Sequence, residues 1–391
     1  MSCSCHNFVF DVMKEFKSVV NSFTFNPPKK YLYTLDDIYS LESMYKNKAK
    51  QYEKVHFHHD NYSSLDKSYT WITENAYIIY KNKEKQKVPS KSKSIVLLYL
   101  RNTSNIHNKS KYTLLYSHGN SASLGSIYSF LYDISTQLKC DVVAYDYSGY
   151  GLSEGVPSEE GLISNIATVY KFMREKLGIK TDKIIAMGES IGSYPSVHLA
   201  SHKPLLSGLI LVNPLASGKK LINKKVIEFD KGDIFNNVRK IKNAHCPILM
   251  IHGQKNKEIP VDHSIVLSNK AKSKVMVWFP PNATHKDIYE KYRCKFLRKL
   301  KKFFVFASEN MSNRNQIEIE KNSSCKSLGS SSCVDELSND GKRSFNFGFE
   351  RKMKLLPFFN SEKKDDDYEE RKNNYDNKNE LDNYLNSEFH L

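Results

Sequence analysis

The sequence lacks several features that would point directly to a secreted or membrane-spanning protein. No apolar stretch is long enough to cross a membrane, and the apolar core of a signal peptide is missing. The seven cysteines are odd in number, and their spacings fit no disulfide framework. Cysteine usage of this kind favours a reducing, cytoplasmic setting.

The basic charge of the chain is unevenly distributed. The net charge is +16, yet from Ser308 onward 17 acidic residues outnumber 13 basic ones. A basic body without a nucleic-acid-binding motif is typical of proteins that meet an anionic membrane surface or acidic partners. A solvated, lysine-rich surface explains the charge equally well. No nucleic-acid partner is predicted.

The central pattern is the pentapeptide G-E-S-I-G at residues 188–192, which has the form G-x-S-x-G. An apolar run at 183–187 precedes it and a helical pattern at 194–202 follows it, as in the nucleophile elbow of hydrolases. Small residues flank Ser190 because the turn is tight, and the turn lifts the hydroxyl above the sheet at the positive end of a helix dipole. The alternative is an ordinary glycine-rich turn with a capping serine, which this context disfavours.

Apolar strand patterns alternate with helical patterns around the pentapeptide. The expected strands cover 77–80, 95–100, 114–116, 142–145, 183–187, 209–212, 247–251 and 275–279. The expected helices cover 127–138, 158–177 and 194–202, and a last helix ends near Phe306. This alternation predicts a mostly parallel central sheet with helices on both faces. The connection at 215–244 has no long apolar helix, so we expect a small lid or none.

Two further loops supply the groups that a nucleophilic serine needs. The strand at 114–116 runs into S-H-G-N, and in this fold the loop after that strand offers a backbone N–H to an oxyanion hole. We expect the N–H groups of Asn120 and Ile191 to hold the oxyanion. His285 follows the last strand, which is the general-base position in the chain order serine, acid, histidine. The rival histidines are His118, His252 and His263.

The first 26 residues have the pattern of a membrane anchor. Cys3 and Cys5 precede an amphipathic helical pattern from Val9 to Phe23, and such cysteines are candidates for S-acylation. One acyl chain holds a protein only marginally, whereas two chains, or one chain with an apolar helical face, hold it firmly. Free thiols on a frayed end, or a helix packed on the domain, are the alternatives.

The expected domain organisation has three parts. The N-terminal anchor segment covers 1–26 and a single hydrolase domain covers 27–307. The segment 308–391 is polar and poor in apolar residues, so we expect it to be disordered.

The motifs together resemble the α/β-hydrolase-domain-containing protein 17 family and the related Bem-forty-six-like serine hydrolases. The shared motifs are H-G-N at 118–120, D-Y-S-G-Y-G at 146–151, G-E-S-I-G at 188–192 and H-G at 252–253. The similarity covers about 27–306, and F-N-P-P at 25–28 is similar to the family's entry segment. The resemblance implies an α/β-hydrolase fold and the removal of palmitate from cysteines of peripheral membrane proteins. It also implies palmitoylated N-terminal cysteines, which Cys3 and Cys5 match in position.

The chain departs from that family at the acid of the catalytic triad. The family has Asp three residues after the His-Gly pair, where this chain has Asn256. The Asp accepts the Nδ1–H of the histidine and sets its tautomer, and in a serine protease its exchange for Asn lowers kcat about ten-thousandfold. Three interpretations remain open: Glu258 or Asp262 supplies the carboxylate, Ser190 and His285 act alone, or the chain is a scaffold with little turnover.

The predicted activity is that of a serine hydrolase that removes palmitate from S-acylated proteins by thioester hydrolysis. We expect it on the cytoplasmic side of a membrane, peripherally at the plasma membrane, with S-acylated membrane proteins or acyl lipids as substrates. The alternatives are a small-lipid esterase of the lysophospholipase or monoacylglycerol lipase type, and a catalytically weakened scaffold. No metal and no other cofactor is implied, since this chemistry uses side chains alone.

Overall fold

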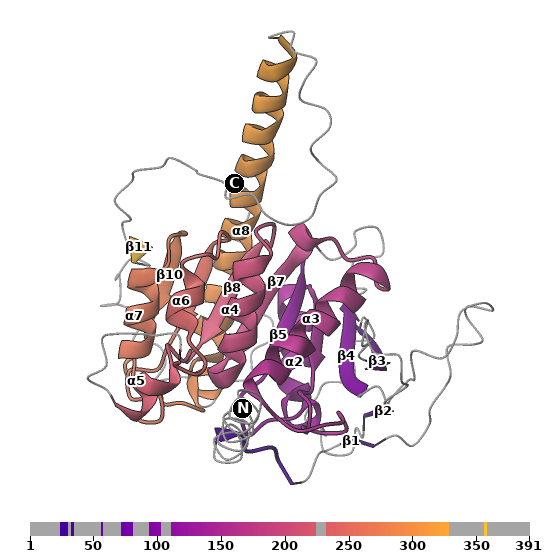
Figure 1. The fold of residues 1–391 in the computed structure, drawn as a ribbon, viewed down its shortest axis with the longest axis vertical. Helices are drawn as coiled ribbons and strands as arrows, with labels where there is room; N and C mark the ends of the chain where they lie inside the picture. Colours follow the sequence, from indigo (N-terminus) through magenta and orange to yellow (C-terminus); the bar gives the residue numbers. More distant parts are fainter. Residues whose placement is uncertain are drawn as a thin grey trace, which may run out of the picture. The chain divides into compact units, whose positions relative to one another are not determined.

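A computed structural model of the protein (Figure 1) describes residues 24–29, 33–34, 56–57, 72–80, 94–102, 111–223, 232–327 and 356–357. Side chains are described for all of these except 33–34, 56–57, 72–80, 313–327 and 356–357. The chain divides into two units, Met1–Leu355 and Leu356–Leu391, and the second contributes only strand β11 (Leu356–Pro357) to the described part. Of the predicted anchor at 1–26 only residues 24–26 are described, and Cys3, Cys5 and the helix at 9–23 lie outside the described residues.

The first unit is organised around one sheet with the strand order β10-β9-β8-β7-β5-β6-β4-β3. Neighbouring strands are parallel from β10 to β6, and the pairs β6–β4 and β4–β3 are antiparallel. The strands are β3 (Ile72–Tyr80), β4 (Ser94–Asn102), β5 (Thr113–Ser117), β6 (Asp141–Tyr145), β7 (Ile184–Glu189), β8 (Gly208–Val212), β9 (Ile248–Ile251) and β10 (Val275–Trp278). A separate antiparallel pair joins β1 (Tyr33–Thr34) to β2 (His56–Phe57). The mostly parallel sheet confirms the predicted α/β-hydrolase fold.

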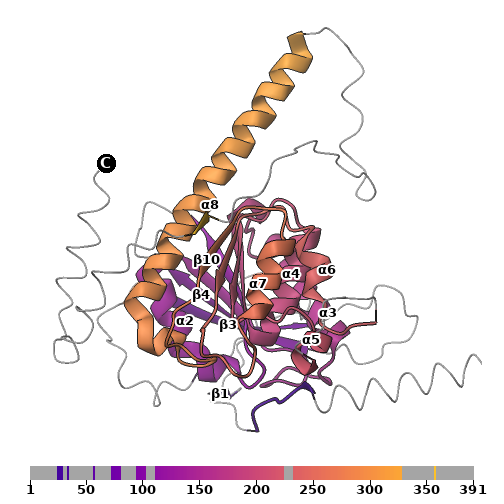
Figure 2. The same cartoon turned by 90° about the vertical axis from the view of Figure 1, so that its left-hand side faces the viewer.

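Helices cover both faces of this sheet (Figure 2). On one face lie α2 (Leu124–Leu138) and α8 (Ile288–Ser327), and on the other lie α3 (Glu159–Glu175), α4 (Ser193–His202), α6 (Asn237–Ile241) and α7 (Asp262–Lys270). Ser158 begins α3 as predicted, since its hydroxyl accepts a hydrogen bond from the N–H of Gly161 at 2.9 Å. Within the described residues, the connection from β8 to β9 carries only the short helices α5 (Gly218–Ile222) and α6, which matches the expected small lid.

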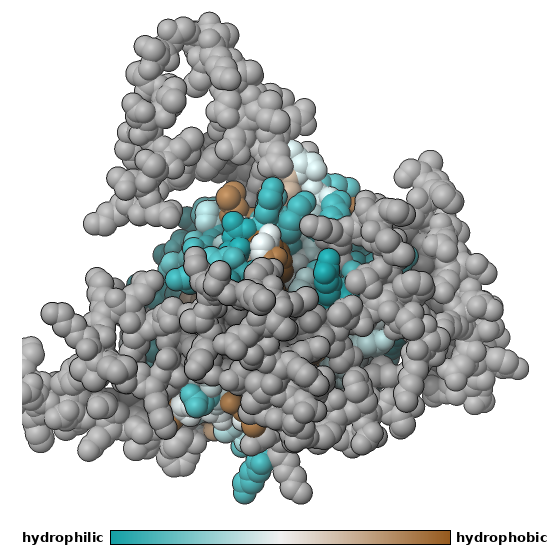
Figure 3. Space-filling model, turned by 90° about the vertical axis from the view of Figure 1, so that its right-hand side faces the viewer, coloured by the Kyte–Doolittle hydropathy of each residue, from teal (hydrophilic) through white to brown (hydrophobic). Residues whose placement is uncertain are grey.

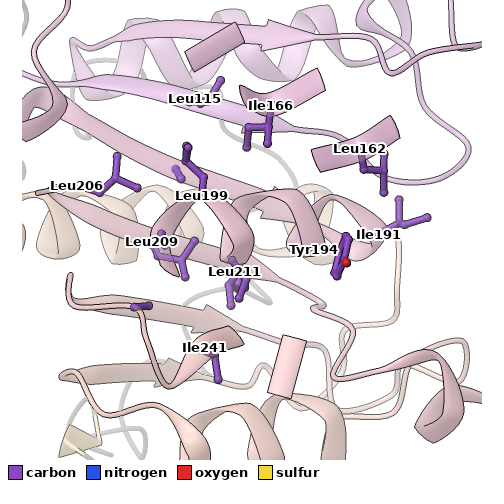
Figure 4. Close-up of a cluster of buried hydrophobic side chains, with 14 of the residues drawn as sticks. Leu115, Leu162, Ile166, Ile191, Tyr194, Leu199, Leu206, Leu209, Leu211 and Ile241 are labelled. Carbon is purple, nitrogen blue, oxygen red and sulfur yellow. The ribbon is translucent and has the colours of Figure 1, made fainter. Parts of the chain in front are cut away.

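The core lies where the central strands meet α3, α4 and α6 (Figure 4). Every residue of β5, β8 and β9 is buried, which is expected for parallel strands that are covered on both faces. Burying one Leu or Ile side chain of this kind stabilises a fold by about 1.5–3 kcal/mol. Ile191, directly after the candidate nucleophile, belongs to this same cluster. The elbow therefore rests on the hydrophobic core.

Helix α8 differs from the prediction at its C-terminal end. The sequence places the end of the domain at 307, but the helix continues to Ser327, with non-helical backbone angles at Tyr292 near its start. Ala307 and Met311 are buried, so packing also continues past the predicted boundary. The prediction of disorder from 308 is wrong for this stretch because extending an existing helix adds a hydrogen bond for each residue fixed.

Two further features concern surfaces and membranes. On the face shown in Figure 3, the described surface is mainly hydrophilic, with isolated hydrophobic residues. Among the residues whose side chains are described, the exposed large hydrophobic ones are Val156, Leu205, Leu221, Ile222, Ile265 and Val305. No helix among the described residues is long and apolar enough to cross a membrane.

Candidate active site

Ser190 stands on a turn between β7 and α4 whose backbone only small neighbours permit. Its φ is +53°, a left-handed conformation that non-glycine residues rarely adopt. A Cβ at Gly188 would lie 2.3 Å from the carbonyl oxygen of Gly192, and a Cβ at Gly192 would lie 2.1 Å from that of Ser117. Strain held in place by tight packing is typical of active sites. The turn therefore has the geometry of a nucleophile elbow.

The loop after β5 packs directly against that elbow. A Cβ added to Gly119 would lie 3.8 Å from the Cβ of Ser190, and the carbonyl of His118 accepts a hydrogen bond from the hydroxyl of Tyr147 at 2.6 Å. Within the described residues, no hydrogen bond uses the backbone N–H of Asn120. Ile191 follows Ser190 at the start of a helical turn, where N–H groups have no intrahelical partner. Both predicted oxyanion donors therefore flank Ser190 with their N–H groups available.

His118 contributes to this loop through its ring. The imidazole is fully buried against Tyr147 and Tyr150, and its Nε2 lies 3.1 Å from Oδ1 of Asp146. The same carboxylate oxygen accepts a hydrogen bond from the N–H of Leu124, the first residue of α2. His118 and Asp146 are thus part of the support of the loop.

His285 lies on the loop after β10, which is bound to the loop after β9. The carbonyl of His285 accepts a hydrogen bond from the amide of Asn213 at 2.8 Å, and the oxygen of that amide accepts one from the N–H of Gly253 at 3.0 Å. A Cβ at Gly253 would lie 2.4 Å from the carbonyl of Ala283. Asn213 was not among the predicted site residues. Its only sequence signal is its place at a strand end, where Asn tolerates its observed φ of +46°.

Asn256 lies against His285, and its amide has only one orientation that satisfies its neighbours. Its Oδ1 accepts a hydrogen bond from the backbone N–H of Ile259 at 2.9 Å, and its Nδ2 lies 2.9 Å from Nδ1 of His285. A backbone N–H can only donate, so the amide oxygen faces Ile259 and the amide nitrogen faces His285. Nδ1 of His285 must therefore accept a hydrogen bond. The neutral imidazole then carries its proton on Nε2.

Ile259 itself is held by a second histidine. Nε2 of His252 donates to the carbonyl of Ile259 at 2.7 Å, and Nδ1 of His252 accepts from the hydroxyl of Ser264 at 2.7 Å. Burial lowers the pKa of His252 to about 4, so this ring is neutral near pH 7. His252 is therefore a structural residue that fixes the segment facing Asn256.

The two carboxylates that were candidates to replace the acid do not face Nδ1 of His285. An oxygen of Glu258 lies 3.8 Å from Nε2, on the opposite side of the ring from Asn256, and this side chain is 59% exposed. Asp262 is the first residue of α7 and acts electrostatically on His252. Glu258 is thus in position to influence the charge of His285. It does not hold a proton on Nδ1, as an Asp at position 256 would.

The electrostatic surroundings keep His285 neutral. Burial lowers its pKa, and the charges of Glu258 and Glu189 oppose this effect. Glu189 precedes Ser190 and accepts a hydrogen bond from the hydroxyl of Tyr116. Sequence reasoning assigned no role to this glutamate because the residue between Gly and Ser varies freely in the motif. In the described residues, no hydrogen bond joins the hydroxyl of Ser190 to His285, and such bonds are often formed only with substrate bound.

In the described part of the chain, no three His, Cys, Asp or Glu side chains cluster as a metal site would need. The described residues include three parts of an acyl-transfer site. These are a serine on a strained elbow, backbone N–H groups beside it, and a neutral histidine on a neighbouring loop.

Comparisons with known proteins identify the family of the chain. The family described as "alpha/beta hydrolase fold" matches residues 112–231. The chain is 34% identical to "Alpha/beta hydrolase domain-containing protein 17B" of Homo sapiens over 241 residues, which cover 59% of this chain and 80% of that protein. It is 37% identical to "Alpha/beta hydrolase domain-containing protein aho-3" of Caenorhabditis elegans over 194 residues, or 50% of this chain and 58% of that protein. Among solved structures, the esterase Pf2001 of Pyrococcus furiosus matches with a TM-score of 0.48 and 15% identity, over 58% of this chain and 91% of that one.

Proposed function

Because the chain belongs to the alpha/beta hydrolase domain-containing protein 17 family, we propose that it is a serine hydrolase that removes palmitate from S-acylated proteins at the cytoplasmic face of a membrane. The observation that carries the proposal is the strained conformation of Ser190 between Gly188 and Gly192, packed against the loop that contains Asn120. The human relative is 34% identical to this chain over the 241 aligned residues.

In the proposed reaction Ser190 attacks the carbonyl carbon of the thioester. Its proton passes to Nε2 of His285, and the negative charge that develops on the carbonyl oxygen is held by the N–H groups of Asn120 and Ile191. The C–S bond breaks, and the cysteine thiolate of the substrate takes the proton from His285. Water then attacks the acyl-serine by the same route and releases the fatty acid.

Asn256 makes this reaction slower than it is with an Asp. Ser190 needs an unprotonated Nε2 on His285, whereas the amide of Asn256 favours the tautomer that carries the proton there. The productive tautomer carries its proton on Nδ1, which places that N–H against the amide N–H of Asn256. This tautomer is disfavoured because the hydrogen bond between Asn256 Nδ2 and His285 Nδ1 is lost. A thioester suits such a weakened site because a thiolate leaves more readily than an amine and needs less help from the base.

The test of the enzyme class is covalent labelling with a fluorophosphonate. We expect the full-length chain to be labelled and Ser190→Ala not to be labelled. The melting temperature of the variant should be nearly unchanged, because an elbow hydroxyl contributes little to packing. Labelling of Ser190→Ala at the stoichiometry of the parent chain means that Ser190 is not the nucleophile, and absence of labelling in both favours the scaffold.

The substrate class is tested separately by comparing a palmitoylated cysteine peptide with a monoacylglycerol. We expect release of palmitate from the thioester with the higher kcat/KM. A preference for the monoacylglycerol assigns the same site to a small-lipid esterase instead. Both substrates are assayed with Ser190→Ala as the blank.

The location at a membrane rests on Cys3 and Cys5, which lie outside the described residues. We propose that both are S-acylated, and that Cys3→Ser with Cys5→Ser moves the protein to the soluble fraction because a helix alone binds weakly and reversibly. Cys294→Ser on α8 is the matched control, since that thiol is exposed in the folded domain. Unchanged membrane binding in the double variant, without hydroxylamine-sensitive acylation of the parent, contradicts the anchor.

A further inference from the structure

The side chain of Asn120 holds a segment from the far N-terminal side of the domain. Its Nδ2 donates to the carbonyl of Thr24 at 2.8 Å, and its Oδ1 accepts from the backbone N–H of Asn26 at 3.1 Å. The hydroxyl of Tyr150 donates to the same oxygen at 2.7 Å. The carboxamide thus pairs with both ends of Thr24–Asn26, which we call the strap. The strap belongs to the indigo stretch at the lower edge of the domain in Figure 1, where α5 also lies.

Phe25, the middle residue of the strap, is anchored in the core. Its side chain is only 7% exposed and meets Phe235 edge to face, with ring centroids 5.9 Å apart. Phe235 in turn meets Tyr194 of α4 edge to face at 5.4 Å. The strap is therefore held between the helix that follows Ser190 and the loop that contains Asn120. The predicted boundary between anchor and domain at 26 accordingly falls inside a packed segment.

The start of the loop is held by the hydroxyl of Tyr147 on the carbonyl of His118, whereas the part around Asn120 has one backbone hydrogen bond of its own. The backbone bond that closes it, from Ala122 N–H to the carbonyl of Gly119, is 3.3 Å long, and Asn26 adds a bond from its amide to the hydroxyl of Ser121 at 3.2 Å. Oxyanion donors must lie within hydrogen-bond distance of one point, and a misplacement of about 1 Å lowers rates about a hundredfold. External support of this loop therefore matters for catalysis.

We propose that the strap is a positioning element for the oxyanion hole, with Phe25 and the side chain of Asn120 as its two fixed points. This inference rests on the proposed function in one respect, namely that the N–H of Asn120 holds the oxyanion. Cys3 and Cys5 precede Thr24 by 21 and 19 residues, so the segment that is proposed to bind the membrane leads into the strap. Displacement of the strap lowers turnover without altering substrate binding.

The first test is a kinetic comparison of Phe25→Ala in the full-length chain with a soluble thioester. We expect kcat to fall at least about tenfold while KM stays within about threefold, because an oxyanion donor acts mainly in the transition state. Phe304→Ala is the matched control, since Phe304 on α8 has a comparable edge-to-face contact, with Tyr112 at 5.7 Å. Equal kcat values for Phe25→Ala and the parent, with both folded, overturn the proposal.

A pair of substitutions at Asn120 sharpens the kinetic test. Asn120→Asp keeps an acceptor for Asn26 N–H and for Tyr150, but loses the donor to Thr24, whereas Asn120→Ala loses all three contacts. We expect kcat to fall in the order parent, Asp variant, Ala variant. The backbone N–H is present in all three, so equal kcat values contradict a role for the side chain.

The second test needs no turnover and separates this proposal from the proposed function. We expect amide hydrogen exchange of residues 118–123 to become faster in Phe25→Ala and to stay unchanged in Phe304→Ala. If the parent chain hydrolyses nothing but exchange rises in this way, the strap holds the loop and the enzymatic function fails. Unchanged exchange at 118–123 overturns the strap proposal whether or not the chain is an enzyme.

Discussion

The two halves of the candidate site have similarly tight backbones, but only one of them has the side chain that the expected chemistry needs. The nucleophile half, formed by 188–192 and 117–120, has both the glycines and the serine that its turn needs. The histidine half, formed by 252–259 and 283–285, has similarly close backbone packing, yet has the amide of Asn256 where the family resemblance implies a carboxylate. A loop can therefore have the backbone geometry of such a site without the carboxylate that the chemistry uses.

The reason lies in which atoms hold each half together. In the histidine half, three contacts hold the loop after β9 close to the loop that carries His285. They are Asn213 to His285, Asn213 to Gly253, and Ile259 N–H to Asn256. All of these are satisfied equally well by Asn or Asp at 256. In the nucleophile half, by contrast, the steric limits at Gly188 and Gly192 act on the backbone that carries Ser190 itself.

The largest effect is expected from a change that breaks the nucleophile half. Gly192→Ala brings a Cβ to 2.1 Å from the carbonyl of Ser117, and overpacking of this kind destabilises a fold by about 3 kcal/mol. The displaced elbow should also lower kcat by about a hundredfold or more. Gly178→Ala is the control, since nothing lies within 4 Å of its Cβ and only its φ of +67° is strained. Urea unfolding and thioester hydrolysis measure both effects, and equal stability of the two variants contradicts the steric argument.

Much of the nucleophile half could be predicted from sequence, and much of the histidine half could not. The pentapeptide at 188–192 predicts its own turn, because the glycines and the serine that define the turn lie within five consecutive residues. Asn213 and Ile259 act across loops that are distant in sequence, and no local pattern marks them. Glu258 illustrates the limit, since it is two residues from Asn256 and yet lies on the opposite side of the imidazole.

A second prediction tests two buried histidines: His252 in the histidine half, and His263 on α7, whose Nδ1 accepts a hydrogen bond from the N–H of Ala216 at 2.9 Å. Burial lowers the pKa of His252 and of His263 to about 4, whereas the unfolded chain binds their protons near pH 6.5. Between these pH values the folded state therefore binds fewer protons than the unfolded state. The contribution of these histidines to the free energy of unfolding is fully present above pH 6.5 and is lost as the pH falls toward 4. For His252 the loss is on the order of 3 kcal/mol.

The measurement is the free energy of unfolding in urea at a series of pH values from 7 to 4.5. His252→Gln has no titrating group at this position, so its stability should change less steeply with pH than that of the parent. Parallel pH dependences of the two proteins contradict the assignment of His252 as a buried, neutral ring.

The smallest effect is expected at Glu258. Its carboxylate faces Nε2 of His285 from an exposed position and raises the pKa of that ring, against the larger effect of burial. Glu258→Gln should change kcat by less than about threefold, because exposed charges interact weakly. The acid limb of the pH–rate profile should move to lower pH, since the pKa of His285 falls further. Loss of activity in this variant makes Glu258 the functional acid.

The most direct test of the comparison is the kcat of Asn256→Asp on a thioester substrate. One oxygen of the new carboxylate still accepts from Ile259 N–H, and the other accepts Nδ1–H of His285, so Nε2 becomes free to take the proton of Ser190. We predict that kcat rises at least about tenfold, while Asn282→Asp, which adds the same charge at an exposed position on the loop before His285, leaves it unchanged. An Asn256→Asp variant that is folded and no faster than the parent contradicts the claim that this amide limits the site.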